Sequence, residues 1–248
     1  MSSMKDRTGK TNTLEKKIVG QAAADLVKDG MVVGLGTGST TAFAIEAIGL
    51  KVKQGLNILG IPTSYQSEIL AINCGISLTL LAQNPVVDIA IDGADQVDRN
   101  LFVIKGGGAA HTNEKIVACS AKRFVVLVDK KKVVDILNHP VPLEVMPNAL
   151  ELVKKAVVEL GGDPVLRMAT RKDGPVITDN GNFIVDADFG EIPDPEKLGV
   201  ELSKCVGVVE HGIFENADEV FVGMSDGGIE ILKKVGKKIS INLRSNLT

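Results

Sequence analysis

Short apolar runs alternate with helix-like segments along the first half of the chain, and this alternation limits the possible folds. Runs typical of buried strands occur at 31–35, 57–61, 78–81, 86–91, 101–104 and 124–128. The intervening segments with helical character are 14–28, 41–50, 67–71 and 113–121. This order is typical of parallel β-α-β units. It predicts an α/β domain with a Rossmann-like parallel sheet.

The pattern changes after Asp135, where three prolines punctuate the chain. Helices are expected at 149–160 and 195–202, and strands at 164–170, 182–188 and 205–210. We therefore expect an inserted smaller α+β domain over 137–210, ferredoxin-like and serving oligomerisation, within a catalytic α/β domain made of 1–136 and 211–248. The apolar run 219–223 is expected to rejoin the first sheet. A single continuous sheet is the alternative.

Charge and residue composition favour a globular, metal-free protein of the cytoplasm. The 248 residues include 28 basic and 31 acidic side chains, without the basic excess of nucleic-acid or membrane-surface binders. The cysteines and histidines are scattered without metal-ligand spacing, so no metal site is expected: Cys74, Cys119, Cys205, His111, His139 and His211. The segment 1–13 is polar and resembles neither a secretory signal nor a membrane anchor, and its role stays open.

Three polar loops follow the apolar runs that end at Leu35, Ile91 and Ile104. Because ligands bind beyond the carboxyl ends of parallel strands, we expect these loops to converge on one crevice. The first loop, 36–41, combines glycines and hydroxyls with a helix start, which suits a phosphate. A dinucleotide fingerprint is disfavoured, since Ser39 replaces its third glycine and no carboxylate follows the next strand.

The second and third loops carry charged groups suited to proton transfer. Asp92 ends a largely apolar run, where a carboxylate is costly unless it is paired or used, and Asp95 follows three residues later. A turn or a helix cap with Asp95 as the capping side chain would explain the pair equally well. Lys105 heads three glycines that can present backbone N–H groups to an anion. Glu114 falls in the first turn of the next helix, where it can also simply compensate the helix dipole.

Four motifs in order resemble the type A ribose-5-phosphate isomerase family: G-T-G-S-T at 36–40, D-G-A-D at 92–95, K-G-G-G-A-A at 105–110 and E-K-I-V-A at 114–118. The similarity extends through 128–130, 142–145 and 176–182, and so covers nearly the whole chain. The resemblance implies an enzyme of the pentose phosphate pathway that interconverts D-ribose 5-phosphate and D-ribulose 5-phosphate through an enediolate. It further implies a homodimer or homotetramer that needs no cofactor and binds neither nucleic acid nor membrane.

The resemblance also assigns roles to residues. Glu114 would carry the proton between C1 and C2, Asp92 would assist ring opening, and Lys105 would stabilise the enediolate, while Asp95 would orient sugar hydroxyls. This chemistry needs a positioned base and a preorganised positive charge. The implied substrate-binding residues are Thr37, Gly38, Ser39, Thr40, Gly93, Ala94, Gly106, Gly107 and Gly108, with Lys132 and Lys16 for the phosphate. Lys130 and Lys131 stay open as alternatives to Lys132.

Three other functions compete with this interpretation. Sugar-responsive transcription regulators bind phosphorylated sugars, but no basic helix-turn-helix-sized segment precedes Leu14. A coenzyme A transferase-like enzyme would use Glu114 to form a covalent thioester. A dehydrogenase is disfavoured by the missing ribose carboxylate.

Overall fold

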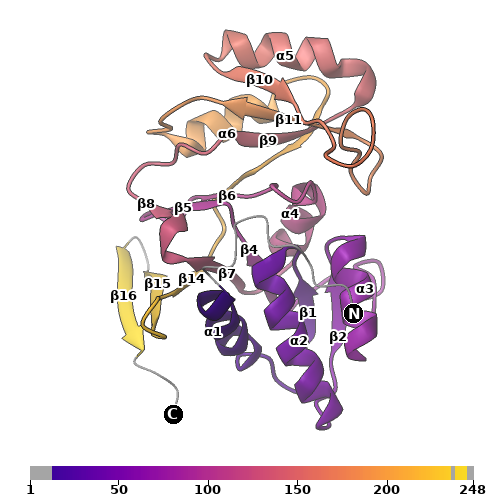
Figure 1. Cartoon of the computed structure of the whole chain (residues 1–248), viewed down its shortest axis with the longest axis vertical. Coiled ribbons are helices and arrows are strands. Elements are labelled where there is room, and N and C mark those ends of the chain that lie inside the picture. Colours follow the sequence, from indigo (N-terminus) through magenta and orange to yellow (C-terminus); the bar gives the residue numbers. More distant parts are fainter. Residues whose placement is uncertain (1–12, 236–237, 245–248) are drawn as a thin grey trace.

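The computed structural model describes residues 13–235 and 238–244, and the described strands form three sheets (Figure 1). The largest sheet has the order β16-β15-β14-β7-β4-β1-β2-β3. Six of its strands are parallel: β1 Val32–Leu35, β2 Leu59–Pro62, β3 Ser77–Leu78, β4 Ile89–Gly93, β7 Phe124–Asp129 and β14 Glu219–Gly223. The antiparallel hairpin of β15 Ile229–Val235 and β16 Lys238–Arg244 extends one edge. The predicted Rossmann-like parallel sheet is therefore confirmed.

Helices cover both faces of this sheet, because alternate residues of its strands enter different cores. In β7, Val125 and Leu127 pack with α1 Thr13–Ala24, α2 Ser39–Lys53 and α3 Tyr65–Cys74. Its Val126 and Val128 lie in a second core that includes residues of α4 His111–Cys119. The strands are thus buried on both faces, which explains their nearly continuous apolar runs.

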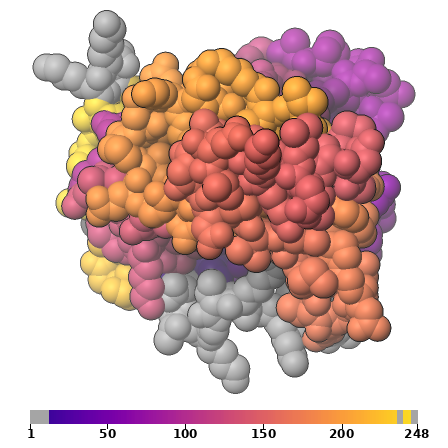
Figure 2. All heavy atoms as spheres, turned by 90° about the horizontal axis from the view of Figure 1, so that it is seen from above, coloured from indigo at the N-terminus to yellow at the C-terminus, as the bar shows by residue number. Residues whose placement is uncertain are grey.

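The second sheet has the order β10-β11-β9-β12 and lies above the first in Figure 1. Its elements follow a βαββαβ sequence: β9 Val141–Val145, α5 Leu150–Glu159, β10 Asp163–Leu166, β11 Phe183–Asp188, α6 Pro195–Ser203 and β12 Val208–His211. This order and its antiparallel pairing match the expected ferredoxin-like arrangement. Seen from above, the salmon segment around α5 and orange segments of the second half form the near surface (Figure 2). The alternative prediction, a single continuous sheet, is therefore wrong, because the second half of the chain forms a sheet of its own.

A third, small sheet lies between the other two and corrects the prediction that strand 101–104 continues the parallel set (Figure 1). Its order is β13-β6-β5-β8, with β5 Gln96–Asp98, β6 Val103–Ile104, β8 Val133–Val134 and β13 Ile213–Phe214. A tight turn reverses the chain between β5 and β6, with Leu101 N donating to Asp98 O at 3.2 Å and Leu101 at φ 64°. β6 therefore runs antiparallel to β5 and outside the large sheet.

β9 is a central strand that the sequence pattern did not predict, because its prolines indicated a boundary. All five residues of Val141–Val145 are buried. The Pro142 carbonyl accepts from Gly212 N at 2.8 Å, beyond the point where β12 stops pairing with β9. Since N and C=O of a strand residue face the same neighbour, the missing N–H of Pro142 removes no bond to β11.

Within the described residues, no helix is both long enough and apolar enough to cross a membrane. The N-terminal segment 1–12, whose role the sequence left open, lies outside the described residues.

Candidate active site

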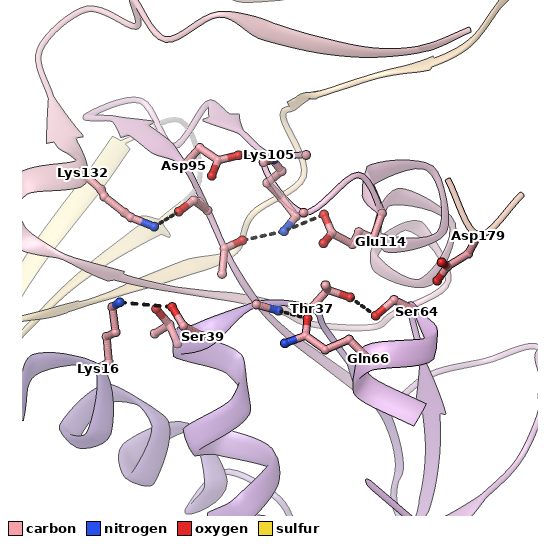
Figure 3. A pocket seen from close by; sticks show the side chains of 18 residues that line it. Lys16, Thr37, Ser39, Ser64, Gln66, Asp95, Lys105, Glu114, Lys132 and Asp179 are labelled. Atoms are coloured by element: carbon pink, nitrogen blue, oxygen red, sulfur yellow. Dashed lines mark hydrogen bonds and ion pairs between the residues drawn. The ribbon is translucent and has the colours of Figure 1, made fainter. Parts of the chain in front are cut away.

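The three polar loops converge on a cavity of about 560 Å³ (Figure 3). Two of them follow β1 and β4 of the large sheet, and the third follows β6 of the small sheet. Fourteen of the predicted site residues line this cavity: Lys16, Thr37, Gly38, Ser39, Thr40, Gly93, Ala94, Asp95, Lys105, Gly106, Gly107, Gly108, Glu114 and Lys132. The remaining one, Asp92, does not line the cavity and lies against Lys105.

A buried lysine between two buried carboxylates forms the charged centre of the site. Lys105 Nζ lies 3.0 Å from Asp92 Oδ2 and 3.0 Å from Glu114 Oε2. It also donates to the carbonyl oxygen of Gly93 at 2.5 Å. The side chains of Lys105, Asp92 and Glu114 are at most 4% exposed. Their mutual contacts compensate the cost of burying these charges, and they fix one ammonium among three oxygens.

The Asp92 carboxylate is further oriented by its second oxygen. Asp92 Oδ1 accepts from the backbone N–H of Gly93 at 2.7 Å and of Thr37 at 3.0 Å. The hydroxyl of Thr41 in α2 approaches the same oxygen at 3.4 Å. Asp92 therefore connects the loop after β1 to Lys105, and its position depends on both strand ends.

Burial and neighbouring charge displace the pKa values of this group. Burial, reinforced by the negative charge of Asp92, raises the pKa of Glu114 to about 8. Burial also raises the pKa of Asp92, against the opposing effect of Lys105. For Lys105 burial disfavours the charge, but Asp92 and Glu114 outweigh it and raise its pKa. A cation thus persists beside a carboxyl group that exchanges a proton near neutral pH, which suits acid-base chemistry.

Asp95 is held by the glycine loop that follows Lys105. Its Oδ2 accepts from Gly107 N at 2.7 Å, and a Cβ on Gly107 would lie 2.5 Å from Asp95 Oδ1. Ala109 closes this loop with φ 60° and donates from its backbone N to Gly106 O at 2.9 Å. A left-handed alanine is uncommon, and such strain persists where surrounding structure enforces it.

Lys16, Lys132 and the start of α2 form the side of the cavity opposite Glu114 (Figure 3). Ser39 and Thr40 begin α2, whose N-cap residue Gly38 has no side-chain cap, so backbone donors face a ligand position there. Lys16 Nζ donates to Ser39 Oγ at 3.1 Å, and Lys132 Nζ donates to the carbonyl oxygen of Ala94. This combination of cations, hydroxyls and helix amides is suited to an anion.

The structure also separates the three consecutive lysines. Lys130 pairs with Glu230 at 2.9 Å, on the β15 side of the sheet. Lys131 is exposed and is not part of the cavity lining, whereas Lys132 is. Among the three, Lys132 is the one placed to reach a ligand in the cavity.

Sequence reasoning missed four lining residues: Ser64, Gln66, Ala110 and Asp179. Gln66 accepts from Gly38 N at 3.1 Å, and Ser64 accepts from the Thr37 hydroxyl at 2.6 Å. The loop after β2 offered a signal, because it is also a strand-end loop, but it lacks charge. Asp179 comes from the second half of the chain, and no local pattern links it to the first.

Metal-binding arrangements are absent from the part of the chain that the structure describes, where no three or more His, Cys, Asp and Glu side chains gather suitably. Cys74, Cys119 and Cys205 are free thiols.

Comparisons with known proteins agree with this geometry. The family model described as ribose 5-phosphate isomerase A (phosphoriboisomerase A) matches residues 59–227. Ribose-5-phosphate isomerase A of Methanosarcina acetivorans is 57% identical over 232 residues, which cover 93% of this chain and 99% of the relative. The Pyrococcus abyssi protein of the same name is 50% identical, with 86% of this chain and 95% of the relative covered.

Solved structures give the same result. Ribose 5-phosphate isomerase A of Methanocaldococcus jannaschii has a TM-score of 0.87 and 48% identity, and covers 90% of this chain and 100% of its own. A D-ribose-5-phosphate isomerase in complex with phospho-erythronic acid has a TM-score of 0.86 and 48% identity, with 89% and 98% covered. By sequence over nearly its whole length and by fold, this chain belongs to the ribose 5-phosphate isomerase A family.

Proposed function

We propose that this chain is an aldose-ketose isomerase that interconverts D-ribose 5-phosphate and D-ribulose 5-phosphate by proton transfer through an enediolate. The observation that carries the proposal is the Lys105 ammonium, 3.0 Å from both Asp92 and Glu114 at the cavity. Moving a proton between adjacent carbons needs a base, and it needs a fixed positive charge where the oxyanion develops. Both groups are present in one buried cluster.

Glu114 is the proposed base. Of the two carboxyl groups that contact Lys105, Glu114 lines the cavity and Asp92 does not, so Glu114 is the one of this pair with direct access to a bound sugar. Its raised pKa, about 8, makes it a stronger base than an ordinary glutamate once it has lost its proton. It takes the proton from one of C1 and C2 and returns it to the other.

Lys105 is proposed to stabilise the oxyanion of the enediolate. Its contacts with Asp92 and Gly93 fix the ammonium before substrate arrives, so little reorganisation is needed during the reaction. Asp92 is proposed to assist ring opening through this same contact, and Asp95 to orient sugar hydroxyls from its position beside Gly107.

The substrate phosphate is proposed to lie at the start of α2, between Lys16 and Lys132. Ser39 and Thr40 supply hydroxyl and amide donors there, and Thr37 and Gly38, whose own donors bind Asp92, Ser64 and Gln66, shape the same end of the cavity. Gly93, Ala94 and Gly106 to Gly108 line the remaining wall. This orientation directs the carbons farthest from the phosphate toward Glu114, as the chemistry requires. The phospho-erythronic acid complex of the related enzyme supports a phosphorylated sugar as ligand.

We further propose that residues 137–210 form an inserted domain and that the protein assembles through it as a homodimer or homotetramer. Support comes from apolar side chains that this region leaves exposed, among them Val165, Met168 and Val206. Three free thiols support a reducing compartment, which we take to be the cytoplasm.

The test replaces Glu114 with glutamine and measures both turnover and solvent-deuterium incorporation at C1 or C2 of ribose 5-phosphate, with chelator present. Removal of a general base lowers kcat by about 10²-fold or more, while KM stays within a few-fold. Glu151→Gln is the matched control, because Glu151 is also a first-turn helix glutamate but lies exposed in α5. It should retain wild-type turnover.

Full activity of Glu114→Gln would overturn the assignment of the base. Covalent trapping of Glu114 by hydroxylamine in the presence of an acyl-CoA would instead support a coenzyme A transferase-like reaction.

A further inference from the structure

Residues 178–182, between β10 and β11, form a loop that is built around one buried carboxylate. Glu144 of β9 is 0% exposed, and its Oε1 accepts from Thr178 Oγ1 at 2.8 Å and from Asn182 Nδ2 at 2.8 Å. The amide of Asn180 donates to the same oxygen at 3.1 Å. Three side chains of this five-residue loop therefore donate hydrogen bonds to Glu144.

These contacts keep Glu144 ionised in the interior. Burial alone opposes its charge, but the nearby Thr112 hydroxyl and the hydrogen bonds from Asn182, Thr178 and Asn180 outweigh burial and lower its pKa. The loop also bonds to itself, with Thr178 N donating to Asn182 O at 2.9 Å and Gly181 N donating to Thr178 O at 2.9 Å. A buried charge satisfied in this way fixes the loop in one conformation.

Asp179 is the exception in this loop, because it faces away from Glu144. It lines the active-site cavity, and its Oδ2 accepts from Tyr65 N at 2.9 Å, across 114 residues of sequence. In Figure 3, Asp179 lies on the opposite side of the cavity from Lys16 and Lys132. The loop thus projects one carboxylate from the second sheet into a cavity otherwise lined by the first half of the chain.

Capping of α3 explains only one oxygen of this carboxylate. Tyr65 is the first residue of α3, and the capping box between Ser64 and Ser67 leaves the Tyr65 N–H to Asp179 Oδ2. Asp179 is also exposed, so no burial requirement fixes its carboxylate. Its remaining distinction is its position at the cavity, where an ionised carboxylate accepts hydrogen bonds and sugars present hydroxyl donors.

We propose that Asp179 binds the substrate, accepting a hydrogen bond from a sugar hydroxyl at the end of the molecule away from the phosphate. Glu144 is then a positioning residue that acts through Asp179. The inference rests on the proposed function, since the phosphate at Lys16 and Lys132 sets the direction of the sugar in the cavity.

The experiment compares Asp179→Ala with wild type in two measurements: KM and kcat for ribose 5-phosphate, and the Ki of inorganic phosphate as competitor. Loss of a hydrogen bond to a charged group should raise KM about tenfold or more, with kcat within about threefold. The Ki of inorganic phosphate should stay unchanged, because this ion occupies only the cationic side. Asp173→Ala is the control, since Asp173 is exposed between the same strands and does not line the cavity.

Two results with Asp179→Ala would overturn the inference. An unchanged KM in Asp179→Ala would show that no sugar contact exists. A parallel rise of KM and of the phosphate Ki would show that the loop only supports the cavity as a whole.

Asp179→Asn separates the two contacts of the side chain, because an asparagine oxygen can still accept from Tyr65 N. A raised KM in this variant supports the sugar contact, whereas a wild-type KM would assign Asp179 to the Tyr65 bond alone and overturn the proposal. A wild-type enzyme inactive on ribose 5-phosphate would contradict the proposed function itself and is distinguishable from all these outcomes.

Discussion

Lys105 shows how one residue acquires a role from its neighbours. Its ammonium is buried and contacts two carboxylates that come from β4 and α4. Lysine is expensive to bury unless it is paired, so the two acids and the cation require one another. Removing Lys105 would leave two buried carboxyl groups without a cation, and removing either acid would take away one of the contacts that hold the ammonium in place. Each of the three therefore contributes both to the stability of the site and to its chemistry.

The assignment of the phosphate lysine is a prediction at this scale. Lys132→Ala should raise both the KM for ribose 5-phosphate and the Ki of inorganic phosphate by about tenfold or more, because a charged contact to the phosphate is lost. Lys131→Ala is the matched control and should change either constant less than twofold, since the exposed Lys131 lies outside the cavity lining. Equal effects of the two substitutions would contradict the assignment. Steady-state kinetics with phosphate competition gives both constants.

The sequence pointed to the residues of the site better than to their contacts. Asp92 could be predicted because it ends an apolar strand of the parallel sheet, whereas Lys105, after β6 of the small sheet, and Glu114, in α4, received their roles from the family motifs. Asp179 could not, because its approach depends on how the second sheet is placed over the first. The direction of Asp92, behind Lys105 and away from the cavity, likewise depends on packing between strands.

At the scale of elements, the end of β1 is fitted closely to the end of β4. Gly36 N donates to Ile91 O at 3.0 Å, and a Cβ on Gly36 would lie closer than 3.0 Å to the Asp92 carboxyl carbon. The two strand ends can therefore approach only because residue 36 has no side chain.

This fit predicts that Gly36→Ala displaces the Asp92 carboxylate and disturbs Lys105 with it. A misplacement on the order of 1 Å costs about 10²-fold in rate, so kcat/KM for ribose 5-phosphate should fall by roughly that factor. The thermal unfolding midpoint, measured on the same samples, identifies any general loss of fold. Wild-type kcat/KM in a folded variant would show that Asp92 does not need its present position.

Element prediction succeeded where periodicity is local and failed where it is not. The parallel strands and α1 to α4 follow from apolar runs and helical stripes, within a few residues at their ends. β9 was missed because Pro140 and Pro142 resemble a boundary, although Pro142 loses no ladder bond at its position. β6 was assigned to the wrong sheet, because a turn at Leu101 reverses the chain without any glycine to mark it.

The buried position of Glu114 makes the free energy of unfolding of the whole protein depend on pH. Its pKa is about 8 in the folded protein and about 4.5 in an ordinary environment. Below the lower value both states hold the proton, so stability is unaffected. Between the two values the folded state binds a proton that the unfolded state has lost, so this group makes stability fall as pH rises. Above about pH 8 the effect levels off.

Glutamine at position 114 stays neutral at every pH, and so Glu114→Gln should become progressively more stable relative to wild type between about pH 5 and pH 8. Urea unfolding of both proteins across this range measures the difference, which cancels the effects of titrating groups that do not interact with Glu114. Glu151→Gln, on the exposed face of α5, should differ from wild type by a constant amount. A constant difference for Glu114→Gln as well would mean that its pKa is not raised by burial.

At the scale of the whole molecule, the sequence predicted two regions of different architecture but not the contacts between them. Three prolines after Asp135 and a change in the order of the expected helices and strands separated an α/β half from an α+β segment. How the second half of the chain contacts the first depends on groups that meet only in three dimensions, such as the Asp179 carboxylate and the backbone N–H of Tyr65. Hydrophobic periodicity along the sequence does not predict contacts between residues that are so far apart in the chain.

The raised pKa of Glu114 has a consequence for the apparent affinity of the enzyme. Near neutral pH the empty enzyme keeps its base mostly protonated, and the base becomes competent only when that proton leaves. When the reactive complex forms, Glu114 therefore releases a proton to the solvent. The strength with which the enzyme holds a sugar in this reactive form thus varies with acidity, although no hydroxyl of the sugar ionises in this range.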